Sequence, residues 1–206
     1  MANVTSVKSK FFGAVDATDD NGLSTAATIG SATTLTLGGA LTSGGSYTSG
    51  DNIGQLITIL SAGDDSGITF TIVGTDAVGD AQTEVVTGAN AGTATSSGYF
   101  NTVASITTSA ASAGNVSAGV TGTGTGTIFA GRTRVRGLQG LSGATAGNIL
   151  LKNTSVTGTT LFTVPTQAAA EQIEPFIPDN GILFKAGAYV NVGSGVSTGT
   201  SIFYDG

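Results

Sequence analysis

The chain has 206 residues and a formal net charge of −6, and it contains no cysteine, histidine or tryptophan. Disulfides, the usual zinc sites and the Ser–His and Cys–His nucleophile pairs are therefore excluded. The net charge also argues against a general nucleic-acid binder, because the chain lacks the basic surplus that phosphate contacts require. Only 10% of the residues are charged and 6% are aromatic, so the surface must consist largely of Thr, Ser, Gly and Asn. Such a surface suits close packing beside other proteins.

The N-terminal region, 1–24, is expected to be an arm that leads into the first β domain. Its start, MANVTSVKSKFFGAV, lacks the apolar core of a secretory signal, and no run approaches the ~20 apolar residues of a membrane span. We therefore expect synthesis in a cytoplasm and no membrane partner. Asp16, Asp19 and Asp20 are interpreted as a solvated turn, because a calcium loop would need an acid where Ala27 stands. A looser oxygen cage built from these three aspartates is the alternative.

Strand signals follow at short intervals. In ITFTIV (68–73) three apolar residues share one face and two threonines share the other, which is the period of two of a half-buried strand. Turn sequences separate such runs, and Asp64 and Asp65 in AGDDSG are interpreted as turn residues. The expected strands are 33–37, 55–60, 68–73, 83–86, 99–108, 127–138, 148–153, 159–164, 182–186, 188–192 and 196–204.

Helix signals are confined to TQAAAEQIEPF (166–176), which has the composition for about two turns, with Thr166 as the N-cap and Pro175 near the end. The 33 glycines and the many Thr and Val residues disfavour helix elsewhere. The sequence therefore predicts an all-β fold of two small antiparallel β-sandwich or barrel modules, with at most one short helix.

The glycine-rich GVTGTGTGT (119–127) is the best candidate for a domain boundary, because the charge balance also changes there. Residues 1–126 carry nine acids and two bases, whereas 127–206 carry four acids and five bases. We interpret the segment as a linker, with an exposed edge strand as the alternative. The predicted organisation is an arm at 1–24, a first β-sandwich domain at 25–126 and a second barrel or sandwich domain at 127–206.

Motifs that carry chemistry are scarce. There is no G-x-x-x-x-G-K-[ST] motif, and TGTGTGT does not follow the dinucleotide-binding fingerprint. Glu171 and Glu174 would share a side of the expected helix and form the pair weighed for glycoside hydrolysis. The shortage of aromatic residues argues against a sugar cleft, so we expect these two glutamates to solvate the helix. No catalytic, metal-binding or cofactor-binding residue is predicted, and the protein is not expected to be an enzyme.

Positive charge clusters in GRTRVRG. Arg132, Arg134 and Arg136 alternate, so on a strand they would emerge from one face about 6.5–7 Å apart. One interpretation is a polar outer strand face. The functional interpretation is a basic stripe that docks on an acidic partner surface, such as the acidic half of a neighbouring copy. Together with Lys8 and Lys10 of the arm, these arginines are the predicted partner-docking residues.

Two long segments resemble modules of tailed-bacteriophage structural proteins, in particular those of marine phages. The first is SAGDDSGITFTIVGTDAVGDAQTEVVTGANAGTATSSGYFNTVASITTS (61–109). The second, GNILLKNTSVTGTTLFTVPT followed by IEPFIPDNGILFKAGAYVNVGSGVSTGTSIFYDG, lies between 147 and 206. The resemblance implies a virion component with no catalytic residues to transfer.

The resemblance implies a capsid decoration (cement) protein, assembled into the virion in the host cytoplasm. Such a protein would bind the major capsid protein or other virion proteins, stabilise the head and form a homo-oligomer such as a trimer. Other positions on the particle, including neck, tail and fibre, are compatible with it. The second hypothesis is a fibre or surface adhesin that binds host glycan, with Tyr47, Tyr99, Tyr189 and Tyr204 as candidate contacts. A depolymerase or lyase is the third, and the missing histidine counts against it.

Overall fold

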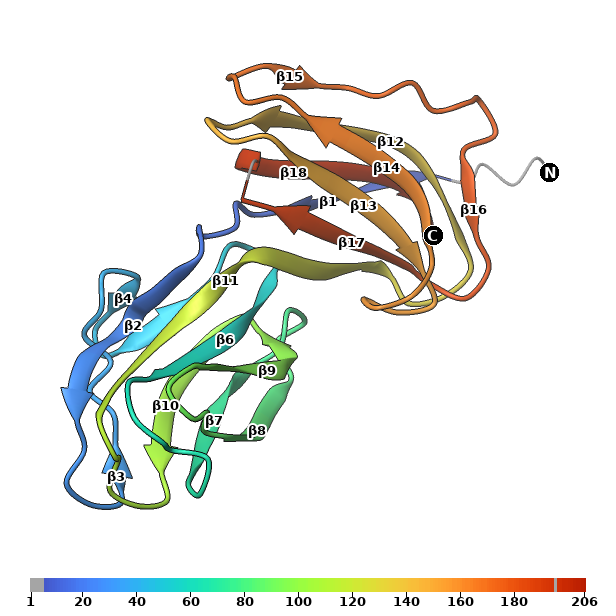
Figure 1. Cartoon of the computed structure of the whole chain (residues 1–206). Coiled ribbons are helices and arrows are strands. Elements are labelled where there is room, and N and C mark those ends of the chain that lie inside the picture. The colour runs from blue at the N-terminus through green and yellow to red at the C-terminus, as the bar shows by residue number, and fades with distance from the viewer. Residues whose placement is uncertain (1–5, 195) are drawn as a thin grey trace. The chain divides into compact units, whose positions relative to one another are not determined.

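Strands are the regular elements of the computed structural model, which describes residues 6–194 and 196–206 (Figure 1). The predicted all-β fold is confirmed: the sheets are antiparallel, and within these residues none closes into a barrel. The prediction of a short helix at 166–176 is wrong, because that segment forms bends and the two-residue strand β15 (Gln172–Ile173). The backbone of Glu171 is instead hydrogen-bonded to Ser142 of the neighbouring strand, so tertiary pairing overrides local helix propensity.

The chain divides into two units, each made of several segments. Unit 1 comprises 1–15, 50–53 and 124–206, whereas unit 2 comprises 16–49 and 54–123. The sequence-based boundaries assumed that each domain is one continuous stretch, and the structure instead assigns two early segments to the C-terminal unit. The expected arm contains all of β1 (Val7–Phe12) and the first part of β2 (Asp19–Thr28).

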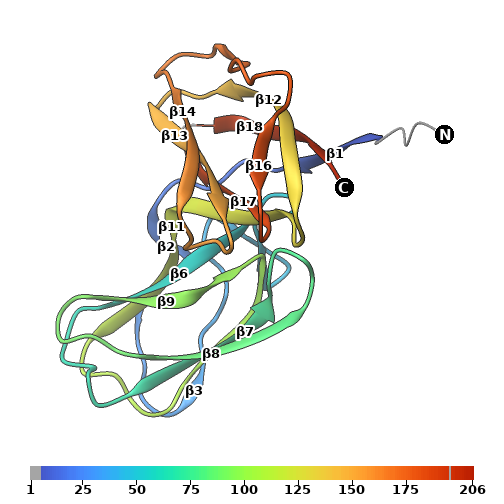
Figure 2. The same ribbon diagram turned by 90° about the vertical axis from the view of Figure 1, so that its right-hand side faces the viewer.

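Unit 1 contains strands of two of the three antiparallel sheets, which can be followed in Figure 2. The first has the order β1–β18–β12–β15, and β16 also pairs with β12. The second has the order β14–β13–β17 and continues to β11. The further strands of unit 1 are β12 (Thr133–Ser142), β13 (Gly147–Asn153), β14 (Thr160–Thr166), β16 (Ile182–Phe184), β17 (Ala188–Gly193) and β18 (Val196–Asp205).

The core of unit 1 combines side chains from both sheets. Phe12, Val135 and Ile202 come from the first sheet, and they cluster with Ile149 and Val190 of the second, all at 0% exposure. Burial of each such side chain contributes roughly 1.5–3 kcal/mol. Most residues of this core are aliphatic, so aliphatic side chains supply most of its burial energy.

Unit 2 contains further strands of the seven-stranded sheet that includes β11, and all strands of the third sheet. One contains β2, the start of β11, β6 and β9, and the other has the order β4–β5–β10–β7–β8, with β3 paired to β10. The bounds are β3 (Thr33–Thr34), β4 (Thr42–Ser43), β5 (Ser46–Thr48), β6 (Gly54–Ser61), β7 (Thr69–Thr75), β8 (Ala81–Thr87), β9 (Thr93–Phe100), β10 (Thr102–Thr108) and β11 (Asn115–Phe129).

The alternation predicted for ITFTIV is confirmed in β7. Phe70 and Ile72 are fully buried and pack with Ile57 and Phe100 in the core of unit 2. Val73, on the opposite face of β7, is 39% exposed. The threonines of this strand therefore belong to the outer face of the sheet.

The glycine-rich segment 119–127 is part of strand β11, so its interpretation as a linker is wrong. Its glycines permit close approach of other chain segments. A Cβ on Gly119 would overlap the carbonyl oxygen of Asp19, and one on Gly126 would lie 2.6 Å from a ring carbon of Phe12. The repeat therefore serves close packing, which only a residue without a side chain allows.

Gln55 on β6 is fully buried in unit 2, and its side-chain amide is hydrogen-bonded at both ends. Its Oε1 accepts from the Asp16 N–H (3.1 Å), the Tyr47 hydroxyl (2.9 Å) and the Ser49 hydroxyl (3.1 Å). Its Nε2 donates to the carbonyl oxygens of Asp16 (3.1 Å) and Thr121 (2.5 Å). One side chain thus joins three other segments to β6.

Replacing Gln55→Leu should destabilise unit 2 by about 3 kcal/mol or more, because several buried polar groups lose their partner at once. Denaturant unfolding followed by circular dichroism measures this loss, and amide hydrogen exchange localises it to β6 and β11. Gln82→Leu is the matched control, because Gln82 is half-buried and makes one long bond of 3.4 Å to Tyr99. Equal losses in the two variants would contradict the role of Gln55.

Candidate docking surface

The side of the β1–β18–β12 sheet that faces away from the core carries apolar side chains. Directly paired residues of an antiparallel sheet point to the same side, so Val7, Phe11 and Phe203 share this face. Val7 is 56% exposed and Phe11 is 43% exposed, while Phe203 is half-buried. The Phe203 ring lies above Gly137, where an added Cβ would be 3.4 Å from the ring.

Phe176 extends this surface. It follows β15 and is 85% exposed, the highest value among the large hydrophobic residues described as exposed. Phe176 and Phe203 line a common groove of about 430 Å³, together with Arg136 and Gln139 of β12. We call Val7, Phe11, Phe176 and Phe203 the outer apolar face. Several exposed apolar side chains on one face mark an interaction site more often than a single exposed residue does.

Sequence reasoning missed the outer apolar face. VKSKFF (7–12) contains alternating positions, but the sequence alone does not say which set is buried. Pairing of β1 with β18 buries Phe12 and leaves Phe11 on the outside. For Phe176 the sequence did contain a signal. This bulky aromatic residue directly follows Pro175 and lies outside every predicted strand, so no sheet was expected to bury it.

The three predicted arginines do not form a uniform stripe. Arg132 precedes β12 and is exposed, and no ion-pair partner of it is found in the part of the chain that the structure describes. Arg134 Nη1 donates to the carbonyl oxygen of Asn180 at 2.9 Å. Arg136 sits at a β-bulge, and its Nη1 donates to the Asp179 carbonyl oxygen at 2.6 Å.

Arg136 is largely neutralised by Asp205 of β18. Its Nε and Nη2 both lie 2.8 Å from Asp205 Oδ2, and this hydrogen bond raises the pKa of Arg136 above its usual range. The side chains are 31% and 16% exposed. The pair therefore holds β12 to β18, and Arg132 and Arg134 are the arginines left with charge to offer a partner.

The two predicted lysines differ in the same way. Lys8 is exposed, whereas Lys10 is half-buried and its Nζ donates to the Thr127 carbonyl oxygen at 2.8 Å. Lys10 Nζ also lies 5.6 Å from the centre of the Phe12 ring. Burial lowers the pKa of Lys10. Lys10 thus has an internal structural role, and Lys8 remains accessible to a partner.

Charge is distributed unequally between the units. All seven basic residues of the chain belong to unit 1, which also has five acids. Unit 2 has eight acids and no base. The imbalance that the sequence showed between its two halves therefore becomes sharper once residues are assigned to the folded units.

The tyrosines give the glycan hypothesis little support. Tyr47 is completely buried, and its hydroxyl lies 2.9 Å from both Gln55 Oε1 and Asp16 Oδ2. Tyr204 packs against the core of unit 1 and against Phe129, with ring centres 5.9 Å apart. Tyr99 and Tyr189 are half-buried. Tyr47 is therefore inaccessible to a sugar, and the others offer no fully exposed ring on which a sugar could stack.

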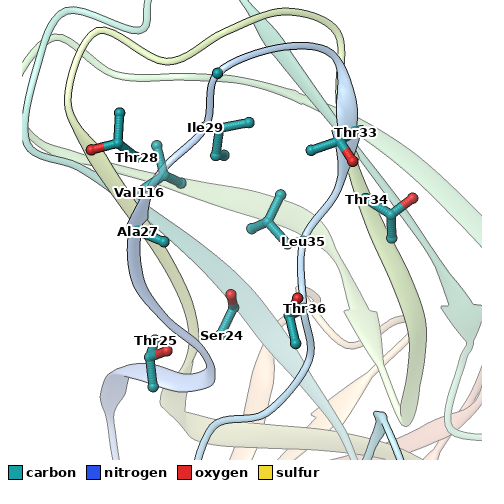
Figure 3. A pocket seen from close by; sticks show the side chains of 11 residues that line it. Ser24, Thr25, Ala27, Thr28, Ile29, Thr33, Thr34, Leu35, Thr36 and Val116 are labelled. Atoms are coloured by element: carbon teal, nitrogen blue, oxygen red, sulfur yellow. The ribbon is translucent and has the colours of Figure 1, made fainter.

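Unit 2 contains a groove of about 410 Å³ beside β2 and β3, shown in Figure 3. The apolar side chains of Ile29, Leu35 and Val116 lie between its walls. No charged residue lines the groove. The rest of its lining carries hydroxyl groups, which belong to Ser24, Thr25, Thr28, Thr33, Thr34 and Thr36. The groove therefore suits a neutral, hydrogen-bonding ligand better than an ion.

The candidate carboxylates show mostly structural contacts. Glu171 and Glu174 line a groove of about 260 Å³, and Glu174 accepts a bond from Gln172 at 3.1 Å. Asp64 Oδ1 accepts the Ser66 N–H and hydroxyl at the predicted turn, which lowers the pKa of Asp64. Asp65 is 1% exposed, and its Oδ1 accepts the Ala113 N–H at 2.8 Å, so it braces two loops.

The aspartates weighed as a calcium cage are used separately. Asp16 accepts the Tyr47 hydroxyl, and Asp19 accepts the N–H of Asn21. Over residues 6–194 and 196–206, no three acidic side chains come together as a metal site. No helix long and apolar enough to cross a membrane occurs in that part of the chain.

Comparison with known proteins adds no relative: no family model matches the chain, and no significant match is found among curated proteins or solved structures. A functional proposal for this chain therefore depends on its own residues and their geometry, together with the resemblance of its two long segments.

Replacing Tyr47→Phe should change the response of unit 2 to alkali. Burial, and secondarily the charge of Asp16, raise the pKa of Tyr47 well above its ordinary value of 10.0. Above about pH 10 the unfolded chain loses this proton while the folded chain keeps it, so stability falls as pH rises, by up to about 1.4 kcal/mol per pH unit. At neutral pH the variant loses about 1 kcal/mol with the hydroxyl bonds.

The stability difference between wild type and Tyr47→Phe should therefore shrink and then reverse as pH rises through this range. Urea unfolding at pH 8, 10 and 11 measures it, with Tyr189→Phe at a half-buried site as the control that keeps the wild-type profile. A constant difference at all three pH values would contradict the assignment.

Proposed function

We propose that this protein is a structural component of a phage virion, a capsid decoration protein that binds the major capsid protein. The observation that carries the proposal is the outer apolar face of unit 1. Phe176 and Val7 are more than half exposed on a chain with few charged groups. Burial against a partner at roughly 25 cal/mol per Å² is the direct way to stabilise such a surface.

Docking through this face explains how the protein would stabilise a shell. In this proposal the decoration protein binds the assembled capsid and not its separated subunits, so its binding shifts the equilibrium toward assembly by mass action. Arg132 precedes β12 and Lys8 lies on β1, and both side chains are exposed, so they would supply charge to the same partner. Rim charges tune the rate and orientation of association more than its final strength.

The chemistry of the chain supports a role in binding. Without His or Cys, the common nucleophile–base pairs cannot form. The grooves of unit 1 are lined mostly by neutral groups, with Glu171 and Glu174 in one groove and Arg136 and Glu174 in another, and Arg136 is already paired with Asp205. A homo-oligomer on the particle, such as a trimer, is part of the proposal, as is assembly in the host cytoplasm.

Adhesion to host glycan is the second candidate function. The threonine-lined groove of unit 2 favours it, because hydroxyl groups above an apolar floor can bind a neutral sugar. The buried Tyr47 and the missing exposed rings count against it. A glycan array probed with the purified chain separates the two: specific binding that Thr34→Val reduces would favour adhesion over capsid docking.

Replacing Phe176→Ser should reduce the affinity for virus particles at least tenfold, since the side chain is 85% exposed and its loss removes docking area without disturbing the core. Cosedimentation with particles stripped of the protein measures binding. Heating the reconstituted particles measures stabilisation, which the variant should fail to restore.

Val85→Ser is the matched control, because Val85 is 59% exposed on β8 of unit 2 and lies outside the outer apolar face. It should bind and stabilise particles as the wild type does. If particles without the protein resist heat as well as complete ones, the decoration role is wrong. If Phe176→Ser binds normally, the outer apolar face is not the docking surface.

A further inference from the structure

A depression at the basic end of the β1–β18–β12 sheet includes one apolar side chain, Leu183. Arg132, Thr133, Arg134, Leu183, Asp205 and Gly206 line this depression of about 270 Å³. Phe184 of β16 pairs with Thr133 of β12. Lys185 follows Phe184 and Arg132 precedes Thr133, so these two basic residues lie at the same end of the paired strands. Asp205 is paired with Arg136. We call this depression the basic socket.

Unit 2 carries a hairpin tip of opposite chemistry between β7 and β8. Val78 is 57% exposed and stands between Asp76 and Asp80. The loop is closed by a bond from the Asp76 N–H to the Asp80 carbonyl oxygen at 2.9 Å. Asp76 Oδ1 also accepts the N–H groups of Val78 (2.9 Å) and Asp80 (3.0 Å). The tip is thus held in one shape before any partner arrives.

We propose that the hairpin tip of one copy, residues 76–80, docks in the basic socket of a second copy. Val78 would contact Leu183, and the carboxylates of Asp76 and Asp80 would meet Arg132 and Arg134. The occupant is another copy because one chain presents both surfaces. All of its bases lie in unit 1, and unit 2 has none that would repel the socket.

The arrangement of the charged groups supports this match. The Asp76 N–H donates to the Asp80 carbonyl oxygen, so the two carboxylates belong to one closed loop. Arg132 and Arg134 are two residues apart in sequence and line the same depression. Guanidinium groups suit carboxylates because their donors form a planar fork. A preformed tip also loses little conformational entropy on binding.

Such a contact joins two different surfaces and is therefore head-to-tail. Head-to-tail contacts close into rings or continue as open chains, depending on the rotation between copies. A single tip in a single socket is a small interface, so association in solution is weak. Copies fixed side by side on a surface would have a high effective concentration and would engage readily. The inference goes beyond capsid docking. Its residues are not among the four of the outer apolar face, although Asp205 and Arg134 continue the row of Val7 on the same side of the sheet.

Sedimentation velocity of the full chain over a range of concentrations tests the contact. At 10 mM salt, where the Debye length is about 30 Å, the average mass of the wild type should rise with concentration. At 1 M salt, where that length is about 3 Å, it should fall toward the monomer. Arg132→Asp and Asp80→Arg should each weaken self-association at least tenfold.

A charge swap gives the decisive comparison. An equimolar mixture of the Arg132→Asp chain and the Asp80→Arg chain contains one native tip–socket pair and one reversed pair, so association should return in the mixture. Lys152→Asp and Asp20→Arg change the net charge equally at sites outside tip and socket, and they should associate as the wild type does. Val78→Ser should weaken association without altering net charge.

The proposal is overturned if the wild type stays monomeric at low salt and high concentration, if the two control variants lose association equally, or if the mixture does not recover it. Failure here is distinguishable from failure of the decoration role. A chain that binds particles through Phe176 but never self-associates would keep the decoration role and lose only the homo-oligomer. A chain that self-associates but does not bind particles would lose the decoration role.

Discussion

The fold depends on one buried amide. Asp16, Ser49, Gln55 and Thr121 each lie within two residues of a point where the chain passes from one unit to the other. Five hydrogen bonds from Gln55 and its neighbours hold these points together inside unit 2. A buried polar network of this kind is strongly stabilising only when every member is satisfied. The discontinuous organisation of the chain is therefore built on a side chain that carries no charge.

Edge protection explains why the predicted lysines and the outer apolar face share one strand. β1 is the first strand in its sheet, and an open edge invites pairing with other chains. Lys10 faces inward from this edge and bonds to Thr127, which disfavours further strand addition there. Phe11 points the other way, onto the outer apolar face. One short strand thus limits unspecific pairing at its edge and offers a specific surface on its side.

Local patterns predicted many of the strands, although not β1, β2 or most of β11, and pairing decided what the strands expose. The period of two in ITFTIV was sufficient to place β7, since apolar spacing and burial coincide there. The run 99–108 was predicted as one strand but contains the end of β9 and all of β10, because the chain reverses at Asn101. The predicted helix at 166–176 does not form, because the Glu171 N–H donates to the Ser142 hydroxyl instead of to a helical carbonyl. The outer apolar face depends on the β1–β18 register, which no local pattern encodes.

Exposure of the outer apolar face fits a protein that is bound to a partner in an assembly. Phe176 is 85% exposed on a chain with only 10% charged residues, so charge repulsion gives little protection against aggregation. A partner that covers this side chain removes that hazard and gains the free energy of its burial. The acidic, base-free unit 2 supplies the opposite property, because copies repel through it unless a basic socket is presented. If both proposals hold, a weakly charged β protein would discriminate in this way between the partner that buries its apolar face and the neighbouring copy that neutralises its acidic tip.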